Sequence, residues 1–170
     1  MVFWAVFAWA APDQTPAITP DIHFTPTRHA IVEAMLQLAG VTAADIVYDL
    51  GSGDGRIPII AAQKYGARGV GIEIDARLVE QSRQIAREAG VEDRVTFLRG
   101  DLFTADVSRA TVVTLYLSPS VNRRLVPKLS RELAPGTRVV SHQFPIQDWT
   151  PTARIRPDYS DVYLYRVPPR

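Results

Sequence analysis

Three carboxylates in this chain are spaced so that they can contact one ligand. Asp49, Glu73 and Asp101 each lie at or just after the end of an apolar run with the composition of a β-strand, at residues 45–50, 68–73 and 94–99. In a parallel sheet the carboxyl ends of neighbouring strands meet at one edge, so the three acids are expected close together. An acid after the second strand can bind a ribose diol. An acid after the third can accept a hydrogen bond from an adenine amino group. The spacing therefore predicts an adenosine-containing ligand.

A glycine-rich loop, residues 51–55 (GSGDG), directly follows the first of these runs. Its small residues let a ligand lie against the backbone. A dinucleotide fold has the spacing G-x-G-x-x-G and places a diphosphate at the helix N-terminus. Here Asp49 and Asp54 bracket the loop, and two carboxylates would repel a diphosphate. S-adenosylmethionine carries an ammonium and a sulfonium and no phosphate, so it fits this loop better than NAD does.

Strand-like and helix-like segments alternate along the chain and must position these residues. We expect helices from residues 25–26 to 40, 55–65, 76–89 and 120–133, and strands at 45–50, 68–73, 94–99, 111–117 and 138–142, with short strands near 153–156 and 162–167. The alternation predicts an α/β fold with a doubly wound, mostly parallel sheet. Leu117 and His142 then join the three acids at the carboxyl ends of strands.

Composition limits the alternatives. The 170 residues fit one folded domain, which we assign to residues 21–170. The net charge of +1 gives no electrostatic argument for nucleic acid, and we predict no nucleic-acid partner. The chain has no cysteine, and its three histidines do not form a helix-spaced ligand pair, so we predict no metal.

With these motifs the sequence resembles the class I S-adenosylmethionine-dependent methyltransferases. Residues 49–55 match their first motif, Glu73 their ribose-binding acid and Asp101 their adenine-binding acid. The resemblance implies a seven-stranded sheet of order 3-2-1-4-5-7-6 whose last strand is antiparallel. It also implies that the methionine end of the cofactor lies against the first motif. The expected cofactor residues are Thr27, Asp49, Gly51, Ser52, Gly53, Gly55, Glu73, Asp101 and Leu102.

A narrower similarity concerns the methyl acceptor. Residues 24–27, 49–56, 110–117, 121–122, 127–129 and 135–142 resemble a small group of protein-lysine methyltransferases, archaeal and mitochondrial, the latter acting on the c-type subunit of ATP synthase and on the adenine nucleotide translocator. The resemblance implies a protein substrate with accessible lysines. Residues 117–120 (LSPS) lack the acid or asparagine and the paired prolines of enzymes that methylate base amino groups, which argues against a nucleic-acid base as acceptor.

Tyr116, Leu117, Pro119 and His142 are the residues we expect along an acceptor channel. An amine must be uncharged to accept a methyl group, and an apolar channel beside a cation lowers the pKa of a lysine. His142 is either a titratable group of this channel or a strand-end histidine bonded to backbone. Two other functions stay open: a methyltransferase for a small amine or phenol, and a non-catalytic module that binds the cofactor.

The first 20 residues form an apolar segment followed by a proline-rich linker. Residues 1–11 (MVFWAVFAWAA) are shorter than the roughly 20 residues needed to span a bilayer and lack the basic start of a signal peptide. An atypical export signal, a membrane-surface anchor and a mis-called start all remain open for them. We expect a monomeric cytoplasmic enzyme, with membrane association through residues 1–11 left open.

Overall fold

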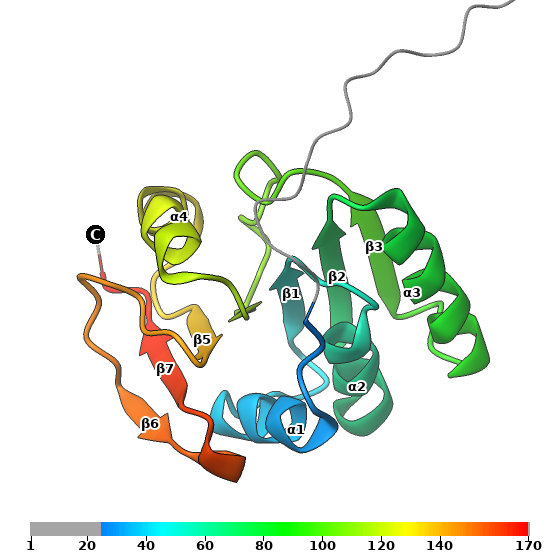
Figure 1. The fold of residues 1–170 in the computed structure, drawn as a ribbon, viewed down its shortest axis with the longest axis horizontal. Helices are drawn as coiled ribbons and strands as arrows, with labels where there is room; N and C mark the ends of the chain where they lie inside the picture. Colours follow the sequence, from blue (N-terminus) through cyan, green and yellow to red (C-terminus); the bar gives the residue numbers. More distant parts are fainter. Residues whose placement is uncertain (1–24, 170) are drawn as a thin grey trace, which may run out of the picture.

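A seven-stranded β-sheet runs through the computed structural model, which describes residues 25–169 (Figure 1). The expectations for residues 1–20 lie outside the described residues. The strands are β1 (Ile46–Leu50), β2 (Arg68–Glu73), β3 (Val95–Arg99), β4 (Val112–Leu115), β5 (Arg138–His142), β6 (Ala153–Ile155) and β7 (Val162–Arg166). The helices are α1 (His29–Leu38), α2 (Arg56–Tyr65), α3 (Ala76–Glu88) and α4 (Pro119–Glu132), and a short 3-10 turn, η1 (Pro157–Tyr159), precedes β7.

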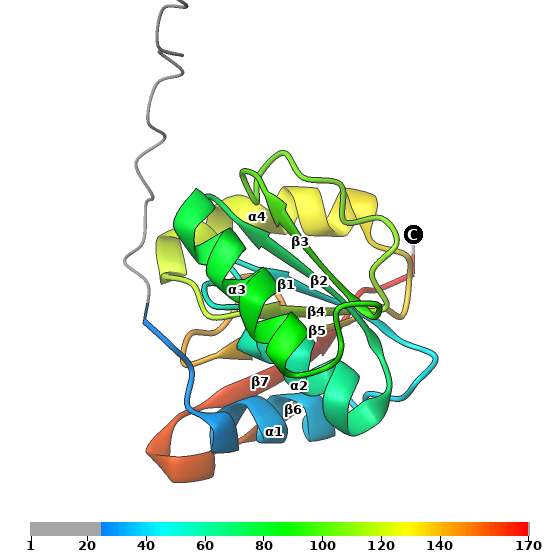
Figure 2. The ribbon, with the colours of Figure 1, turned by 90° about the vertical axis from the view of Figure 1, so that its right-hand side faces the viewer.

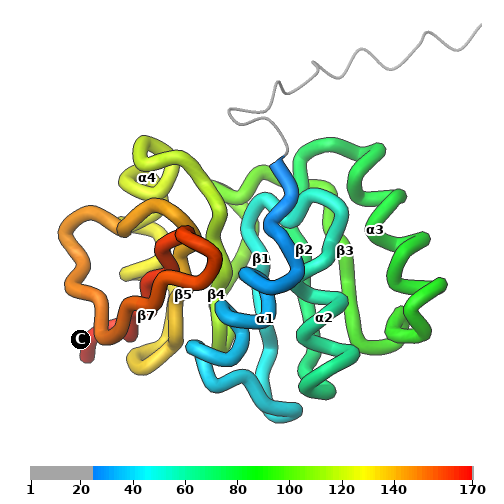
Figure 3. Tube along the Cα trace, turned by 60° about the horizontal axis from the view of Figure 1, so that its bottom comes forward, coloured from blue at the N-terminus to red at the C-terminus, as the bar shows by residue number. Residues whose placement is uncertain are grey.

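The strand order is β3-β2-β1-β4-β5-β7-β6, and the tube view follows it across the sheet (Figure 3). β1 to β5 pair in parallel, whereas β7 is antiparallel to both β5 and β6. The doubly wound sheet and the order implied by the resemblance are both confirmed. The order reverses between β1 and β4, which is the place where open α/β sheets bind their ligands.

Helices cover both faces of the sheet (Figure 2). On one face, α4 buries Leu125, Leu129 and Leu133, whose spacing of four residues places them on one side of a helix. On the other face, α1 and α2 pack against β1, β4, β5 and β7, and α3 packs against β3. Helices α1, α3 and α4 therefore each bury one side of their surface against the sheet.

The prediction that the first helix begins at residues 25–26 is wrong. The helix begins at His29, and the backbone at Arg28 is extended, with φ −61° and ψ 145°. A residue distant in the sequence holds the segment before the helix. Arg56 Nη1 donates a hydrogen bond of 2.8 Å to the carbonyl oxygen of Thr27, and this oxygen is then engaged outside the helix. β4 also ends at Leu115, two residues earlier than expected, so that Tyr116 and Leu117 leave the sheet and cross its edge.

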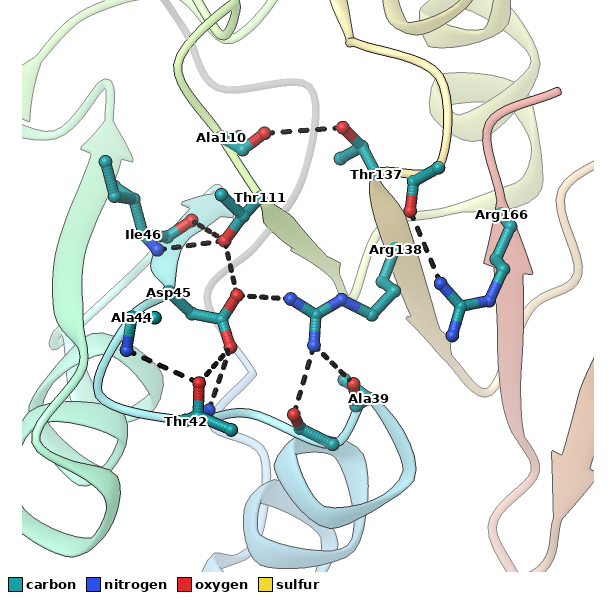
Figure 4. A network of polar contacts seen from close by, with 12 residues as sticks. Ala39, Thr42, Ala44, Asp45, Ile46, Ala110, Thr111, Thr137, Arg138 and Arg166 are labelled. Atoms are coloured by element: carbon teal, nitrogen blue, oxygen red, sulfur yellow. Dashed lines mark hydrogen bonds and ion pairs between the residues drawn. The ribbon is translucent and has the colours of Figure 1, made fainter. Parts of the chain in front are cut away.

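A polar network closes the amino ends of the strands (Figure 4). The Asp45 carboxylate accepts hydrogen bonds from the Thr42 N–H (2.8 Å) and the Thr111 hydroxyl (2.7 Å), and it pairs with the Arg138 guanidinium. Arg138 also donates to the carbonyl oxygen of Ala39 at 2.8 Å. Burial alone would raise the pKa of Asp45, but these donors outweigh it and hold that pKa below the ordinary 3.8. The network ties the end of α1 to the starts of β1, β4 and β5.

Candidate active site

A cavity of about 440 Å³ opens at the carboxyl ends of β1, β2, β3 and β4. Its volume lies in the range of small-molecule and cofactor sites. Nine of the residues expected at the site line it: Thr27, Asp49, Gly51, Ser52, Glu73, Asp101, Leu102, Tyr116 and Leu117. Gly53, Gly55, Pro119 and His142 do not. The structure therefore brings nine of the expected residues together around one cavity and places the other four outside its lining.

Glu73, at the end of β2, is fixed by backbone donors. One of its carboxylate oxygens accepts from the Gly53 N–H (2.9 Å), and the other accepts from the N–H groups of Ile74 (2.8 Å) and Asp75 (2.9 Å). A carboxylate can accept about four hydrogen bonds, so capacity remains for a ribose hydroxyl. Glu73 thus holds the glycine-rich loop as well as facing the cavity, a role that the sequence did not indicate.

Asp49, on β1, is only 4% exposed. The Thr114 hydroxyl donates to it at 2.7 Å, and it forms no ion pair within residues 25–169. Burial raises the pKa of Asp49 to about 7, and the charges of Glu73 and Asp54 push it in the same direction. An acid in this environment is costly to ionise alone and favourable beside a cation. The site is therefore suited to a ligand with a positive group next to β1.

Asp54 is not the free carboxylate expected from the sequence. Its Oδ2 pairs with Arg56 Nη2 at 2.5 Å, and the same guanidinium donates to the Thr27 carbonyl oxygen. This ion pair partly offsets the charge of Asp54, and the shared guanidinium fastens the segment before α1 to the start of α2. Thr27 is buried as a result and forms part of the cavity wall.

The glycines of the loop play different parts. Gly51 has φ +79°, and a Cβ on it would lie 3.0 Å from Leu117 Cδ2. A larger residue at this position would therefore crowd Leu117 in the wall of the cavity. Gly55 has φ +77°, and a Cβ there would lie 2.5 Å from the ring of Phe97 and 2.6 Å from Ser82 Cβ. Gly55 therefore serves close packing against β3 and α3. Gly53 is buried and contributes its N–H to Glu73.

Asp101 and the adjoining residues close the far side of the cavity. Asp101 Oδ1 accepts from the Phe103 N–H at 2.8 Å, which orients its carboxylate, and Leu102 lines the wall next to it. Ser52 Oγ is buried beside the cavity and has no hydrogen-bond partner among the described residues. This hydroxyl faces the backbone of β2, where a Cβ on Gly71 would lie only 2.5 Å from Ser52 Oγ, so it packs beneath the glycine-rich loop.

Only two of the four residues expected along the acceptor channel line the cavity. Tyr116 and Leu117 line the cavity, whereas Pro119 is exposed at the start of α4. His142 is 4% exposed and stacks behind Tyr116, with ring centroids 4.1 Å apart. Neither of its ring nitrogens has a partner within residues 25–169, so the alternative of a backbone-bonded histidine is wrong for its side chain. Burial, and then the charge of Arg28, lower the pKa of His142 to about 4, so its ring is neutral at neutral pH.

Comparison with known families decides what this cavity serves. The model of the ANTKMT methyltransferase domain matches residues 49–153, which include the glycine-rich loop and all three acids. The chain belongs to this methyltransferase family. A protein-lysine N-methyltransferase of Saccharolobus islandicus is 43% identical over 153 residues, 87% of this chain and 95% of that protein. A human lysine N-methyltransferase for the c-type subunit of ATP synthase is 36% identical, and the match spans 86% of this chain but only 63% of the human protein.

A solved structure gives the cofactor. An RNA methyltransferase from Salinibacter ruber in complex with S-adenosyl-L-homocysteine is 54% identical, with a TM-score of 0.85 over 86% of this chain and 95% of that one. The buried Asp49 carboxylate suits a ligand with a positive group, and the Glu73 carboxylate retains capacity to accept from a hydroxyl, as this cofactor requires. The protein is thus an S-adenosylmethionine-dependent methyltransferase, and the cofactor expected from the sequence is confirmed.

Replacing Glu73 with glutamine should weaken binding of S-adenosylhomocysteine by about 1.5–3 kcal/mol, the range for hydrogen bonds to a charged group. The loss combines the ribose contact with a looser Gly53 backbone, since an amide cannot accept from all three N–H donors. Isothermal titration calorimetry measures the change. Glu80→Gln, on the exposed face of α3, is the control and should bind normally. Unchanged affinity in a folded Glu73→Gln protein would remove Glu73 from the cofactor site.

Proposed function

We propose that this enzyme methylates the ε-amino group of lysine side chains in proteins. The observation that carries the proposal is the match to the protein-lysine N-methyltransferase of Saccharolobus islandicus, because it spans nearly the whole length of both chains. Relatives named for the c-type subunit of ATP synthase and for the adenine nucleotide translocase support the same acceptor group. Their acceptors share a primary amine on a protein side chain.

The residues of the site are suited to this reaction. When bound, the cofactor supplies a methyl group on a sulfonium, which is already a good leaving group. The protein therefore has to hold the cofactor, place the amine and exclude water. Tyr116 and Leu117 give the acceptor side of the cavity an aromatic and aliphatic wall, where a neutral amine is favoured over an ammonium. The neutral ring of His142 supports this wall without adding charge.

RNA is the second candidate acceptor, because the relative from Salinibacter ruber is described as an RNA methyltransferase. Two features of this chain favour protein instead. Residues 117–120 carry no acid or amide to hold a base amino group. Helix α4 also lacks a continuous basic stripe, since Lys128 is buried and paired with Glu132 at 2.6 Å.

A direct test offers both acceptors to the purified full-length enzyme with methyl-labelled S-adenosylmethionine. One reaction contains a mixture of unmodified proteins and the other contains total RNA. We expect label in protein, located on lysine by mass spectrometry, and none in RNA. Asp49→Asn serves as the control impaired in cofactor binding. Label in RNA alone would overturn the proposal in favour of the second candidate.

We also propose that the enzyme acts in the cytoplasm, where its cofactor is made. No helix within residues 25–169 is long and apolar enough to cross a bilayer. Because the residues that line the cavity lie between Thr25 and Arg124, deleting residues 1–20 should leave cofactor affinity and lysine methylation in solution unchanged, as measured by calorimetry and label transfer. Cell fractionation checks the location of the full chain. A processed form outside the cytoplasm would contradict this proposal.

A further inference from the structure

Backbone strain is concentrated between β5 and β7. Within residues 25–169, the non-glycine residues with positive φ are Gln143 (69°), Asp148 (67°), Asp158 (47°) and Tyr159 (62°). A positive φ is uncommon for such residues, and for a bulky one such as tyrosine it is an outlier. Strain of this kind persists only where neighbouring structure enforces it, and it clusters at active sites and ligand clamps. The two adjacent strained residues of η1 are therefore the first place to look for a function.

One side of this turn is fastened to the wall of the cavity. Arg28 Nη1 lies 3.6 Å from the Asp158 carboxylate, and Arg28 Nη2 donates to the Asp158 carbonyl oxygen at 3.2 Å. Arg28 directly follows Thr27, which lines the cavity. In Figure 2 the segment before α1 and the turn before β7 lie side by side.

The other side of the turn is hydrogen-bonded to Gln143, at the end of β5. The Gln143 N–H donates to the Asp161 carbonyl oxygen at 2.6 Å, and Ser160 Oγ lies 3.4 Å from Gln143 Oε1. Gln143 directly follows His142, the ring that stacks behind Tyr116. The turn thus joins the segment that carries Thr27 to the end of β5, where His142 packs against the cavity residue Tyr116.

Tyr159 projects from this bridge and is 93% exposed. Its ring is barely buried, so it adds little to the stability of the fold, while its backbone conformation is unfavourable. Tyrosine is enriched in protein interfaces and among the side chains that contribute most to binding. A ring held outward on a strained, fastened turn suits contact with a partner.

The charges around Tyr159 favour a protein partner over RNA. Each arginine of the turn and its flanks is paired with an acid: Arg28 with Asp158 (3.6 Å), Arg154 with Asp161 (2.9 Å) and Arg156 with Asp161 (3.7 Å). RNA binding relies on unpaired cations that replace counterions on the phosphates. The three arginines share two aspartates and leave one net positive charge, which is little for a phosphate backbone, and an aromatic ring in this setting suits an apolar side chain.

We propose that the Asp158–Tyr159 turn is the docking point for the protein acceptor. The ring of Tyr159 packs against an apolar residue next to the target lysine and directs that lysine to the wall formed by Tyr116. The inference rests on the proposed lysine methylation and adds to it a preference for lysines with apolar neighbours.

The test uses full-length enzyme and two synthetic peptides, one with phenylalanine and leucine beside its lysine and one with serine on both sides. The unmodified enzyme should prefer the apolar peptide by about tenfold or more in kcat/KM. Tyr159→Gly should lose that preference through a raised KM, with unchanged affinity for S-adenosylhomocysteine. Its melting temperature should rise or stay level, because glycine adopts this φ without strain. Tyr159→Asn, which also tolerates the conformation, should behave alike, and Tyr159→Phe should retain the preference.

Asp148→Gly is the matched control, since it relieves the same kind of strain at another exposed position and should leave peptide kinetics unchanged. If the unmodified enzyme and Tyr159→Gly each methylated the two peptides with the same kcat/KM, the docking inference would be wrong and the proposed function would still hold. Methylation of a single-stranded RNA oligonucleotide and of neither peptide would overturn the proposed function, and the docking inference with it.

Discussion

Replacing Asp49 with asparagine is expected to stabilise the cofactor-free protein while weakening cofactor binding about 100-fold. Removing one partner of a buried charge pair costs about 2–5 kcal/mol, which covers this loss of affinity. The gain in stability has a separate cause. The folded protein raises the pKa of Asp49 from its ordinary 3.8 to about 7, so ionising this acid opposes folding. Asparagine carries no charge, and its amide oxygen can still accept from the Thr114 hydroxyl.

The pH dependence of this gain has a defined sign. Below pH 3.8 the acid is protonated in both the folded and unfolded states and costs nothing. As the pH rises to about 7 the unfolded chain loses its proton first, so stability falls, and above 7 the full cost remains. The stabilisation by Asp49→Asn should therefore be larger at pH 8 than at pH 5.

Thermal unfolding at the two pH values and calorimetry with S-adenosylhomocysteine measure both effects. Asp93→Asn, at an exposed position, is the control and should change neither quantity at either pH beyond experimental error. Normal cofactor affinity in the Asp49→Asn protein would show that the cationic end of the cofactor lies elsewhere.

Gly55→Ala is expected to lower the free energy of unfolding by about 2–5 kcal/mol. An L-residue in the left-handed conformation costs about 1–2 kcal/mol, and overpacking a filled site adds about 1–3 kcal/mol. Both apply here, because φ is +77° and the new methyl group would meet the Phe97 ring at 2.5 Å and Ser82 Cβ at 2.6 Å. The loop, β3 and α3 would have to separate to admit it.

Gly90→Ala separates the two contributions. Its φ is +66°, but nothing lies within 4 Å of the added Cβ, so only the conformational cost of about 1–2 kcal/mol is expected. Urea unfolding of both variants gives the difference. Equal costs would contradict the packing explanation. If Gly55→Ala instead lost cofactor binding at unchanged stability, Gly55 would be a cofactor contact, as predicted from the sequence.

The sequence was sufficient for the features that depend on local pattern. The alternation of strand-like and helix-like segments predicted the α/β class, because such alternation builds parallel strands joined by helices. The acids at the ends of β1, β2 and β3 located the cavity, because parallel strands end at a common edge. The strand order came only from the resemblance, since spacing along a chain does not say which strands are neighbours.

The remaining features depend on contacts between residues distant in the sequence. Arg56 reaches Thr27 across 29 positions, and that bond delays the start of α1. Glu73 holds the Gly53 N–H across 20 positions, and Gly55 meets Phe97 from another strand. The sequence indicated Glu73 as a ribose ligand and Gly55 as a cofactor residue, and it gave Arg56 no role of its own. Only the folded arrangement shows the second partner.

Because of the network around Asp45, the acids at the two ends of the strands differ in pKa. Asp45 precedes β1, and its pKa is held below 3.8, whereas Asp49, four positions later on the same strand, titrates at about 7. Uptake of a proton near neutrality therefore occurs at the cofactor edge while Arg138 keeps its partner at the opposite edge. Without its cofactor, the protein should therefore change the charge of the cavity near neutral pH, while Asp45 at the other end of the strands keeps its contact with Arg138.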